Sequence, residues 1–266
     1  MDGQGDAVQT GLDLQVPAGA ATAGSRWLLT GNEAAGMGAL RGGVRFVAAY
    51  PITPATEILE WLAPNLQKIG ATLVQAEDEL ASINMCIGAS FAGVPALTAT
   101  SGPGFSLMLE GLGLAVAAEV PLVVIDVMRG GPSTGIPTKS EQTDLNAAVY
   151  GLHGEAPHLV LAPTSIADAL FTTQWAVHLA ESMQTPAIVL SDQALGQTTA
   201  VINPPANVKF LAERAVTRSP RSDYARYAIT ADGVSPVTLP GTPGGQYTAD
   251  GLEHSLRGTP SSRGED

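Results

Sequence analysis

Apolar runs rich in β-branched residues alternate with longer amphipathic segments along most of this chain, and this alternation limits the folds open to it. The apolar runs have the length of buried strands, whereas the segments between them repeat apolar residues with a helical period of about 3.6. The predicted strands cover residues 44–50, 71–75, 94–100, 122–127, 158–162 and 187–191. The predicted helices cover residues 31–43, 54–69, 78–92, 105–118, 144–150 and 165–183. This order predicts an α/β fold with a doubly wound parallel sheet.

The amino-acid composition changes, and the periodicity is lost, near both ends of this alternating region. Residues 1–25 combine Gly, Ala, Asp and Gln without periodicity and are predicted to form a disordered arm or linker. Order is expected from residue 26, with a short strand at Leu28 and Leu29, and the folded domain is predicted to cover 26–203. Residues 204–266 are dominated by Pro, Gly, Ser, Thr and Arg. We expect an irregular tail there, which either wraps a partner or is the remnant of a linker to a missing C-terminal domain.

The net charge and the single cysteine exclude several kinds of binding partner and several kinds of site. The net charge of -12 argues against binding to nucleic acid or to an anionic membrane surface, because both select for clusters of Lys and Arg. The sequence has no apolar run of about 18 residues and no basic N-terminal leader, so we expect a cytoplasmic protein. The single cysteine, Cys86, makes an internal disulfide or a thiolate cluster impossible and predicts a buried thiol. The four histidines have no metal-ligand spacing, and we expect no metal site on this chain.

Two loops that follow predicted strands carry groups suited to an anion. In YPITP (residues 50–54), Thr53 lies at the mouth of a helix, where hydroxyl and free N–H groups can receive a carboxylate. The alternative is a proline-rich turn in which Thr53 is an ordinary N-cap. The long loop 128–143 carries Arg129, the only Arg between Arg45 and Arg214, and an isolated Arg at a strand end needs an anionic partner. The alternative for this loop is a variable surface segment.

Two helix starts also follow strands. Glu77, Asp78 and Glu79 precede an apolar helix, and capping by Asp78 together with the helix dipole accounts for acids at this place. The apolar neighbours suggest, however, that one carboxylate is drawn into a buried interface as a proton relay. The segment TSGPG (residues 100–104) opens another helix with glycines that let a ligand approach the backbone. It matches neither a Walker loop nor GxGxxG, and a plain chain-reversing turn remains the alternative.

In their common order, YPITP, the acidic helix start, TSGPG and MRGGPSTGIPTKSEQTDL resemble the alpha subunit of 2-oxoacid:ferredoxin oxidoreductases. Within that family the chain is most similar to the 2-oxoglutarate type. The resemblance covers about residues 28–202 and continues weakly at 247–254. It implies the pyrimidine-binding domain of a thiamine diphosphate enzyme.

The resemblance also implies roles for individual residues. Glu79 best matches the catalytic glutamate that hydrogen-bonds the aminopyrimidine ring and promotes deprotonation of the thiazolium carbon, and Glu77 is the second choice. The substrate-side residues of the family match Thr53, Arg129 and Thr138. The cofactor-side residues match Tyr50, Pro51, Ile52, Ser101 and Gly102.

The implied partners follow from what this sequence lacks. No GDG segment is present to hold Mg²⁺ and the diphosphate, and no cysteines are present for an iron–sulfur cluster. The resemblance therefore implies a beta subunit that carries these groups, with thiamine diphosphate shared between the chains and no activity of this chain alone. The implied reaction is oxidative decarboxylation of 2-oxoglutarate with coenzyme A to succinyl-CoA, CO2 and reduced ferredoxin. The alternatives are another thiamine-dependent decarboxylase or synthase and an inactive scaffold.

Overall fold

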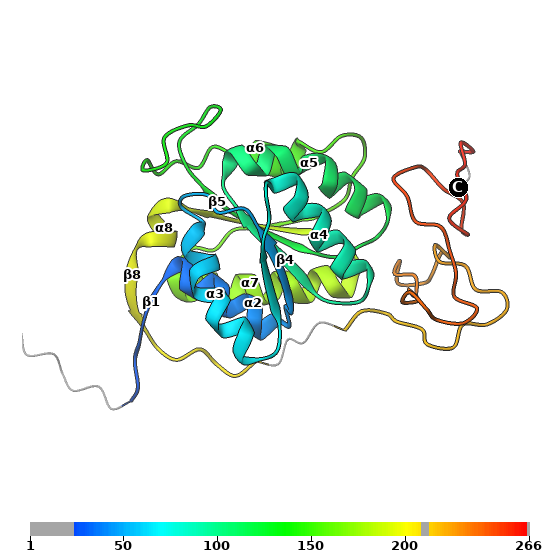
Figure 1. Ribbon diagram of the computed structural model, residues 1–266, viewed down its shortest axis with the longest axis horizontal. Coiled ribbons are helices and arrows are strands. Elements are labelled where there is room, and N and C mark those ends of the chain that lie inside the picture. The colour runs from blue at the N-terminus through cyan, green and yellow to red at the C-terminus, as the bar shows by residue number, and fades with distance from the viewer. Residues whose placement is uncertain (1–23, 209–212, 265–266) are drawn as a thin grey trace, which may run out of the picture.

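The computed structural model describes residues 24–208 and 213–264, and a six-stranded parallel sheet lies at its centre (Figure 1). From one edge to the other the strands are β3 (Thr72–Gln75), β2 (Phe46–Ala49), β4 (Ala96–Thr100), β5 (Val123–Met128), β7 (Ala187–Asp192) and β6 (Leu159–Leu161). Every neighbouring pair is parallel. The predicted α/β fold with a parallel sheet is confirmed.

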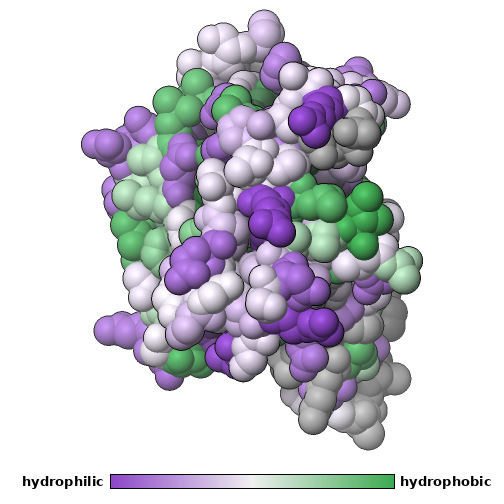
Figure 2. Space-filling model, turned by 90° about the vertical axis from the view of Figure 1, so that its right-hand side faces the viewer, coloured by the Kyte–Doolittle hydropathy of each residue, from purple (hydrophilic) through white to green (hydrophobic). Residues whose placement is uncertain are grey.

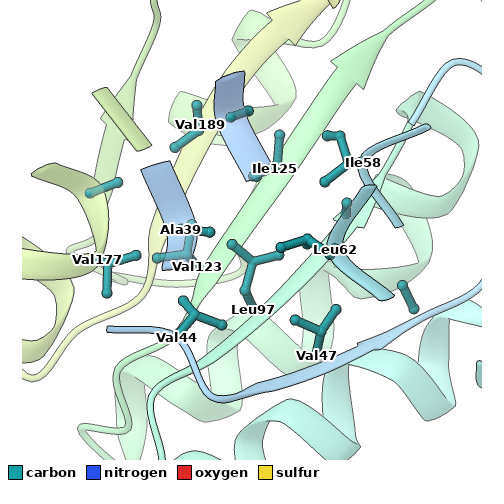
Figure 3. Close-up of a cluster of buried hydrophobic side chains, with 14 of the residues drawn as sticks. Ala39, Val44, Val47, Ile58, Leu62, Leu97, Val123, Ile125, Val177 and Val189 are labelled. Atoms are coloured by element: carbon teal, nitrogen blue, oxygen red, sulfur yellow. The ribbon is translucent and has the colours of Figure 1, made fainter. Parts of the chain in front are cut away.

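Helices cover both faces of this sheet (Figure 1). One layer contains α2 (Gly31–Gly42), α3 (Thr56–Lys68) and α7 (Ile166–Met183), and the other contains α4 (Glu79–Phe91), α5 (Gly102–Ala117) and α6 (Leu145–Tyr150). In β5, the alternate residues Val123, Ile125 and Val127 pack toward the first layer (Figure 3), and Val124 and Met128 pack toward the second. Because both faces are buried, the strand is almost continuously apolar, as its sequence VVIDVM shows.

A small antiparallel sheet stands apart from the main one. It pairs β1 (Trp27–Thr30) with β8 (Thr199–Ile202), which follows the short helix α8 (Gln193–Gln197). The predicted strand at Leu28 and Leu29 is therefore confirmed, whereas the sequence analysis missed α8 and β8. The reason is local, because β8 has only one buried residue, Ile202, and gives no clear apolar run.

Two helix starts differ from prediction by more than one residue. Helix α3 begins at Thr56 instead of residue 54, and its N-cap is Ala55, which makes no side-chain capping bond. The alternative of Thr53 as an N-cap is therefore wrong. Helix α5 begins at Gly102 instead of residue 105, because proline is tolerated in the first helical turn. In α4, Asp78 is the N-cap, and its carboxylate accepts a hydrogen bond from the Ala81 N–H at 2.6 Å.

The buried thiol predicted for Cys86 is confirmed. Its side chain has no exposed surface, and its Sγ lies 3.2 Å from the carbonyl oxygen of Leu97. Burial raises the pKa of Cys86 to about 12, so the group is an inert thiol at neutral pH. No helix in the described ranges is long and apolar enough to cross a membrane.

The described residues 213–264 follow an irregular path beside the core, drawn orange to red in Figure 1. Two arginines hold them there. Both Nε and Nη2 of Arg214 donate to the Glu181 carboxylate, at 2.9 and 2.8 Å, and both side chains are almost fully buried. Arg226, which is 1 % exposed, donates to Glu119 and to the Ser235 hydroxyl. On this side of the molecule, polar and neutral residues cover most of the surface, and apolar residues form separate small patches (Figure 2).

Residues 1–23, which include most of the predicted arm, lie outside the described residues. The division of the chain into arm, domain and tail stays a prediction.

The buried Arg214–Glu181 pair predicts a large loss of stability when one partner is removed. We expect Arg214→Ala to lower the free energy of unfolding by about 3–5 kcal/mol, because Glu181 is left buried and uncompensated. Chemical denaturation measures this change. The exposed pair Arg221–Asp223 supplies the control, and Arg221→Ala should change stability by no more than roughly 0.5 kcal/mol. Equal effects of the two substitutions would contradict the anchoring role of Arg214.

Candidate functional site

The candidate site lies at the carboxyl ends of the strands of the parallel sheet, called the carboxyl edge below. The loops after β2, β4 and β5 and the start of α4 after β3 all leave the sheet there, because parallel strands have their carboxyl ends on the same side. All the residues assigned roles by resemblance are on these segments. The sheet thus brings together loops that are up to about 80 residues apart in the sequence.

Arg129 is the residue that joins these loops. Its Nη1 donates to the carbonyl oxygen of Thr53 at 2.5 Å, and its Nη2 donates to the carbonyl oxygen of Thr134 at 2.6 Å. The residue is 5 % exposed, and its buried Nε has no partner among the described residues. Burial lowers the pKa of Arg129, while the negative charge of Glu79 raises it. The guanidinium is thus a fixed cation between the YPITP loop and the loop 128–143.

Glu79 is a buried carboxylate in the first turn of α4. It is 7 % exposed and has no hydrogen-bond partner among the described residues, whereas Glu77 lies exposed before the helix. Gly104 makes room for the Glu79 side chain, because a Cβ there would collide with it and with the Thr100 hydroxyl. The carboxylate is therefore held in place by packing, with its acceptor capacity left open.

A cavity of about 640 Å³ opens beside Arg129. It is lined by the start of α5 and by both ends of the long loop: Gly102, Pro103, Ser106, Leu107, Arg129–Thr134, Thr143 and Asp144. Ser101 directly precedes this lining, is fully buried, and has no partner for its Oγ among the described residues. An arginine and the open start of a helix in one cavity suit an anionic ligand.

The other predicted residues have different surroundings. Tyr50 is 41 % exposed, and Ile52 packs against the hydrophobic core below the YPITP loop. Pro51 is half-buried, and the side chain of Thr53 is exposed. Thr138 lies exposed on a turn of the long loop and is not part of the lining of the cavity. The roles assigned to these residues stay predictions.

Two buried polar groups at this edge were missed by the sequence analysis. Asn32, which is 1 % exposed, donates from Nδ2 to the carbonyl oxygen of Pro54 at 2.8 Å and so fixes the YPITP loop. Asp126 lies in the middle of β5, and Asp144, at the start of α6, contacts it. A signal for Asp126 was present in the sequence, since a single acid in the apolar run VVIDVM is unusual for a strand buried on both faces. In the described ranges, no group of three or more His, Cys, Asp or Glu side chains is arranged to hold a metal ion.

Comparison with known proteins agrees with this geometry. Residues 37–263 match the family described as pyruvate flavodoxin/ferredoxin oxidoreductase, thiamine diphosphate-binding. The chain belongs to this family. It is also similar to a solved structure of 2-oxoglutarate:ferredoxin oxidoreductase from Magnetococcus marinus with 2-oxoglutarate, coenzyme A and succinyl-CoA bound. The TM-score is 0.91 with 44 % identity, and the match covers 98 % of this chain and 46 % of that one.

Curated members of the family are similar over most of the chain. The 2-oxoglutarate synthase subunit KorA of Archaeoglobus fulgidus is 53 % identical over 169 residues, which are 64 % of this chain and 49 % of the relative. The 2-oxoacid:ferredoxin oxidoreductase 1 subunit alpha of Sulfurisphaera tokodaii is 44 % identical over 249 residues, 88 % of this chain and 39 % of the relative. Subunit KorA of Methanothermobacter thermautotrophicus is 39 % identical over 89 % of this chain and 62 % of its own length. The chain thus spans about half the length of these relatives.

The contact between Gly104 and Glu79 predicts that a single methyl group disturbs the site. We expect Gly104→Ala to lower the free energy of unfolding by about 1–3 kcal/mol, because the new Cβ overpacks against Glu79 and Thr100. Gly113→Ala in the same helix is the control, since a Cβ there meets nothing within 4 Å and alanine favours the helix by up to about 1 kcal/mol. Thermal denaturation compares the two. A harmless Gly104→Ala would contradict the described packing of Glu79.

Proposed function

We propose that this chain supplies the pyrimidine side of a thiamine diphosphate site in the alpha subunit of a 2-oxoglutarate:ferredoxin oxidoreductase. The observation that carries the proposal is Glu79, a buried carboxylate without a hydrogen-bond partner at the carboxyl edge of the sheet. The oxygens of this side chain are not fully enclosed, so a ligand can reach them. The similarity to 2-oxoglutarate enzymes supports the choice of reaction.

The residues at this edge fit the cofactor. Glu79 offers a carboxyl oxygen to a ring nitrogen, and the Ser101 Oγ is a buried polar atom without a partner in the described structure. Gly102 and Gly104, in the first turn of α5, let Asp144 and Glu79 pack against the helix start. When bound, thiamine diphosphate supplies the carbon nucleophile for 2-oxoacid decarboxylation. The part of Glu79 is to hold the ring and to accept or share its proton.

Arg129 accounts for recognition of the substrate. Its guanidinium is fixed by the carbonyl groups of Thr53 and Thr134, so it contributes positive potential to the cavity without needing to be ordered by the ligand. A 2-oxoacid carries a carboxylate beside the reacting carbonyl, and this carboxylate is the anion we assign to Arg129, with the Thr53 and Thr138 hydroxyl groups as further donors. Burial strengthens the attraction by excluding water.

The proposed enzyme needs a second chain. The beta subunit is expected to hold Mg²⁺, the cofactor diphosphate and an iron–sulfur cluster, and the complete complex to convert 2-oxoglutarate and coenzyme A to succinyl-CoA and CO2 with ferredoxin as the electron acceptor. The net charge of -12 agrees with small-molecule and protein partners and not with nucleic acid.

Replacement of Glu79 tests the proposed role most directly. In the reconstituted complex, we expect Glu79→Gln to retain thiamine diphosphate and to slow exchange of the cofactor C2 proton by about 10²–10⁴-fold, because the amide cannot share the proton. NMR follows this exchange without any turnover. Glu77→Gln is the matched control, since Glu77 is exposed, and it should leave exchange unchanged. Loss of exchange in the control instead of in Glu79→Gln would contradict the assignment.

Replacement of Arg129 tests substrate recognition separately. We expect Arg129→Glu to reduce kcat/KM for 2-oxoglutarate by at least about 100-fold, because a charge that attracts the carboxylate becomes one that repels it. Arg45→Glu makes the same charge change on an exposed residue that directly precedes β2, at the amino ends of the strands. It should leave kcat/KM nearly unchanged. Circular dichroism verifies that both variants are folded. An Arg129→Glu complex with normal kcat/KM would show that another group binds the carboxylate.

A further inference from the structure

Asp126 is a buried acid for which the proposed reaction has no use. It lies in β5, has no exposed surface, and neither of its carboxylate oxygens has a donor among the described residues. Its Cα is in register with Thr100 on β4 and with Leu190 on β7, so the side chain belongs to the middle of the sheet. An isolated carboxylate at such a place is strongly disfavoured.

The side chain that meets Asp126 is a second acid, Asp144, which also lines the cavity beside Arg129. The two carboxyl groups are in hydrogen-bonding contact, and the Asp144 Oδ2 is buried without any other partner among the described residues. Two carboxylates accept but do not donate, so a bond between them requires one proton. Burial and the neighbouring Asp144 raise the pKa of Asp126 well above the ordinary value of a carboxyl, which leaves Asp126 as the proton donor.

This contact lies at the base of the loop 128–143. Asp126 precedes Arg129 by three residues, and Asp144 directly follows Thr143, whose hydroxyl donates to the carbonyl oxygen of Arg129 at 3.3 Å. The two ends of the loop are thus tied at neighbouring points. Gly102 permits the close approach, since a Cβ there would lie 2.8 Å from the Asp144 Oδ2.

We propose that Asp126 and Asp144 share one proton and that this proton fastens the base of the loop 128–143, which makes the two acids positioning residues for Arg129. Further along, the loop is held by two hydrogen bonds: the Gln142 Nε2 donates to the Asp192 carboxylate at 2.7 Å, and the Ala194 N–H donates to the Ser140 hydroxyl at 3.1 Å. Neither of these bonds holds the end of the loop that carries Arg129. The shared proton adds a contact at that end, beside the bonds of the Gly130 N–H to the Lys139 carbonyl and of the Thr143 hydroxyl to the Arg129 carbonyl.

The other titratable groups on neighbouring elements are engaged elsewhere. Glu79 on α4 packs against Gly104, and Arg129 bonds the carbonyl groups described above. Asp192, at the end of β7, accepts from the Leu195 N–H and from Gln142, and His158, before β6, contacts the carbonyl oxygens of Ala156 and Ala148. No cation therefore neutralises the pair in the described structure, and the proton itself is what keeps the two acids together.

The pair should make the loop sensitive to alkaline pH. The pKa of Asp126 is raised in the folded state, so the folded chain binds this proton more tightly than the unfolded chain does. The stability that the proton provides is present at low pH and is lost as pH rises toward the raised pKa. Above that pH the two acids repel each other. The loop should open before β5 does, because residues 131–143 are mostly exposed whereas β5 is buried.

Hydrogen exchange of the full chain tests this proposal without ligand or partner. After correction for intrinsic rates, amides of residues 129–143 should exchange about tenfold faster at about pH 9 than at about pH 6. Asp126→Asn should abolish this increase, because its amide donates to Asp144 at every pH. Asp223→Asn removes an acid at the surface and should retain the increase. An increase in Asp126→Asn equal to that of the unmodified chain, or none in the unmodified chain, would overturn the proposal.

Infrared spectroscopy provides a second measurement that needs no folded variant. The unmodified chain should show the C=O stretch of a protonated carboxyl group at neutral pH, and this band should disappear over the pH range in which the loop loses protection. Absence of the band at neutral pH would overturn the proposal as well. The effect on substrate rests on the proposed function: in the complex, KM for the 2-oxoacid should rise with pH and stay flat in Asp126→Asn. If hydrogen exchange behaves as expected and KM does not, the proposed function is wrong, while the shared proton between Asp126 and Asp144 is still supported.

Discussion

The hydrogen bonds from Arg129 to the carbonyl groups of Thr53 and Thr134 are the interaction on which the candidate site depends. They connect the loop after β2 to the loop after β5, two segments that the chain itself separates widely. They also keep a cation almost fully buried near Glu79, so the candidate site brings a guanidinium close to a carboxyl group. No other side chain among the described residues hydrogen-bonds both of these loops at once.

The parallel sheet makes such an arrangement possible, because it collects loop after loop at one edge. Small residues then decide how closely the loops and helices approach. Gly104 admits Glu79 and Gly102 admits Asp144, so the start of α5 touches both acids. These two acids are therefore closely packed against the helix start, and a methyl group added at either glycine is expected to disturb them.

Much of this architecture could be predicted from the sequence, because strand and helix periods are long and regular between residues 44 and 191. Arg129 was singled out by its chemistry, as an isolated arginine at a strand end, whereas the roles of Glu79 and Thr138 were assigned by resemblance and stay predictions. Three features were not predicted from the sequence. Strand β8 has too few buried residues to give a pattern, Asn32 acts through a backbone carbonyl 22 residues away, and the contact between Asp126 and Asp144 depends on the folding of a long loop. Long-range polar contacts leave no periodic signal in one sequence.

The cofactor content of the chain with and without a partner tests the central claim most directly. The chain is co-purified with a beta subunit that carries the diphosphate-binding half, and bound thiamine diphosphate is measured in the complex and in each chain alone. We expect stoichiometric cofactor in the complex and none on this chain by itself, because Glu79 and Arg129 are proposed to form only one side of the site. Stoichiometric cofactor on the isolated chain, or none in the complex, would contradict it.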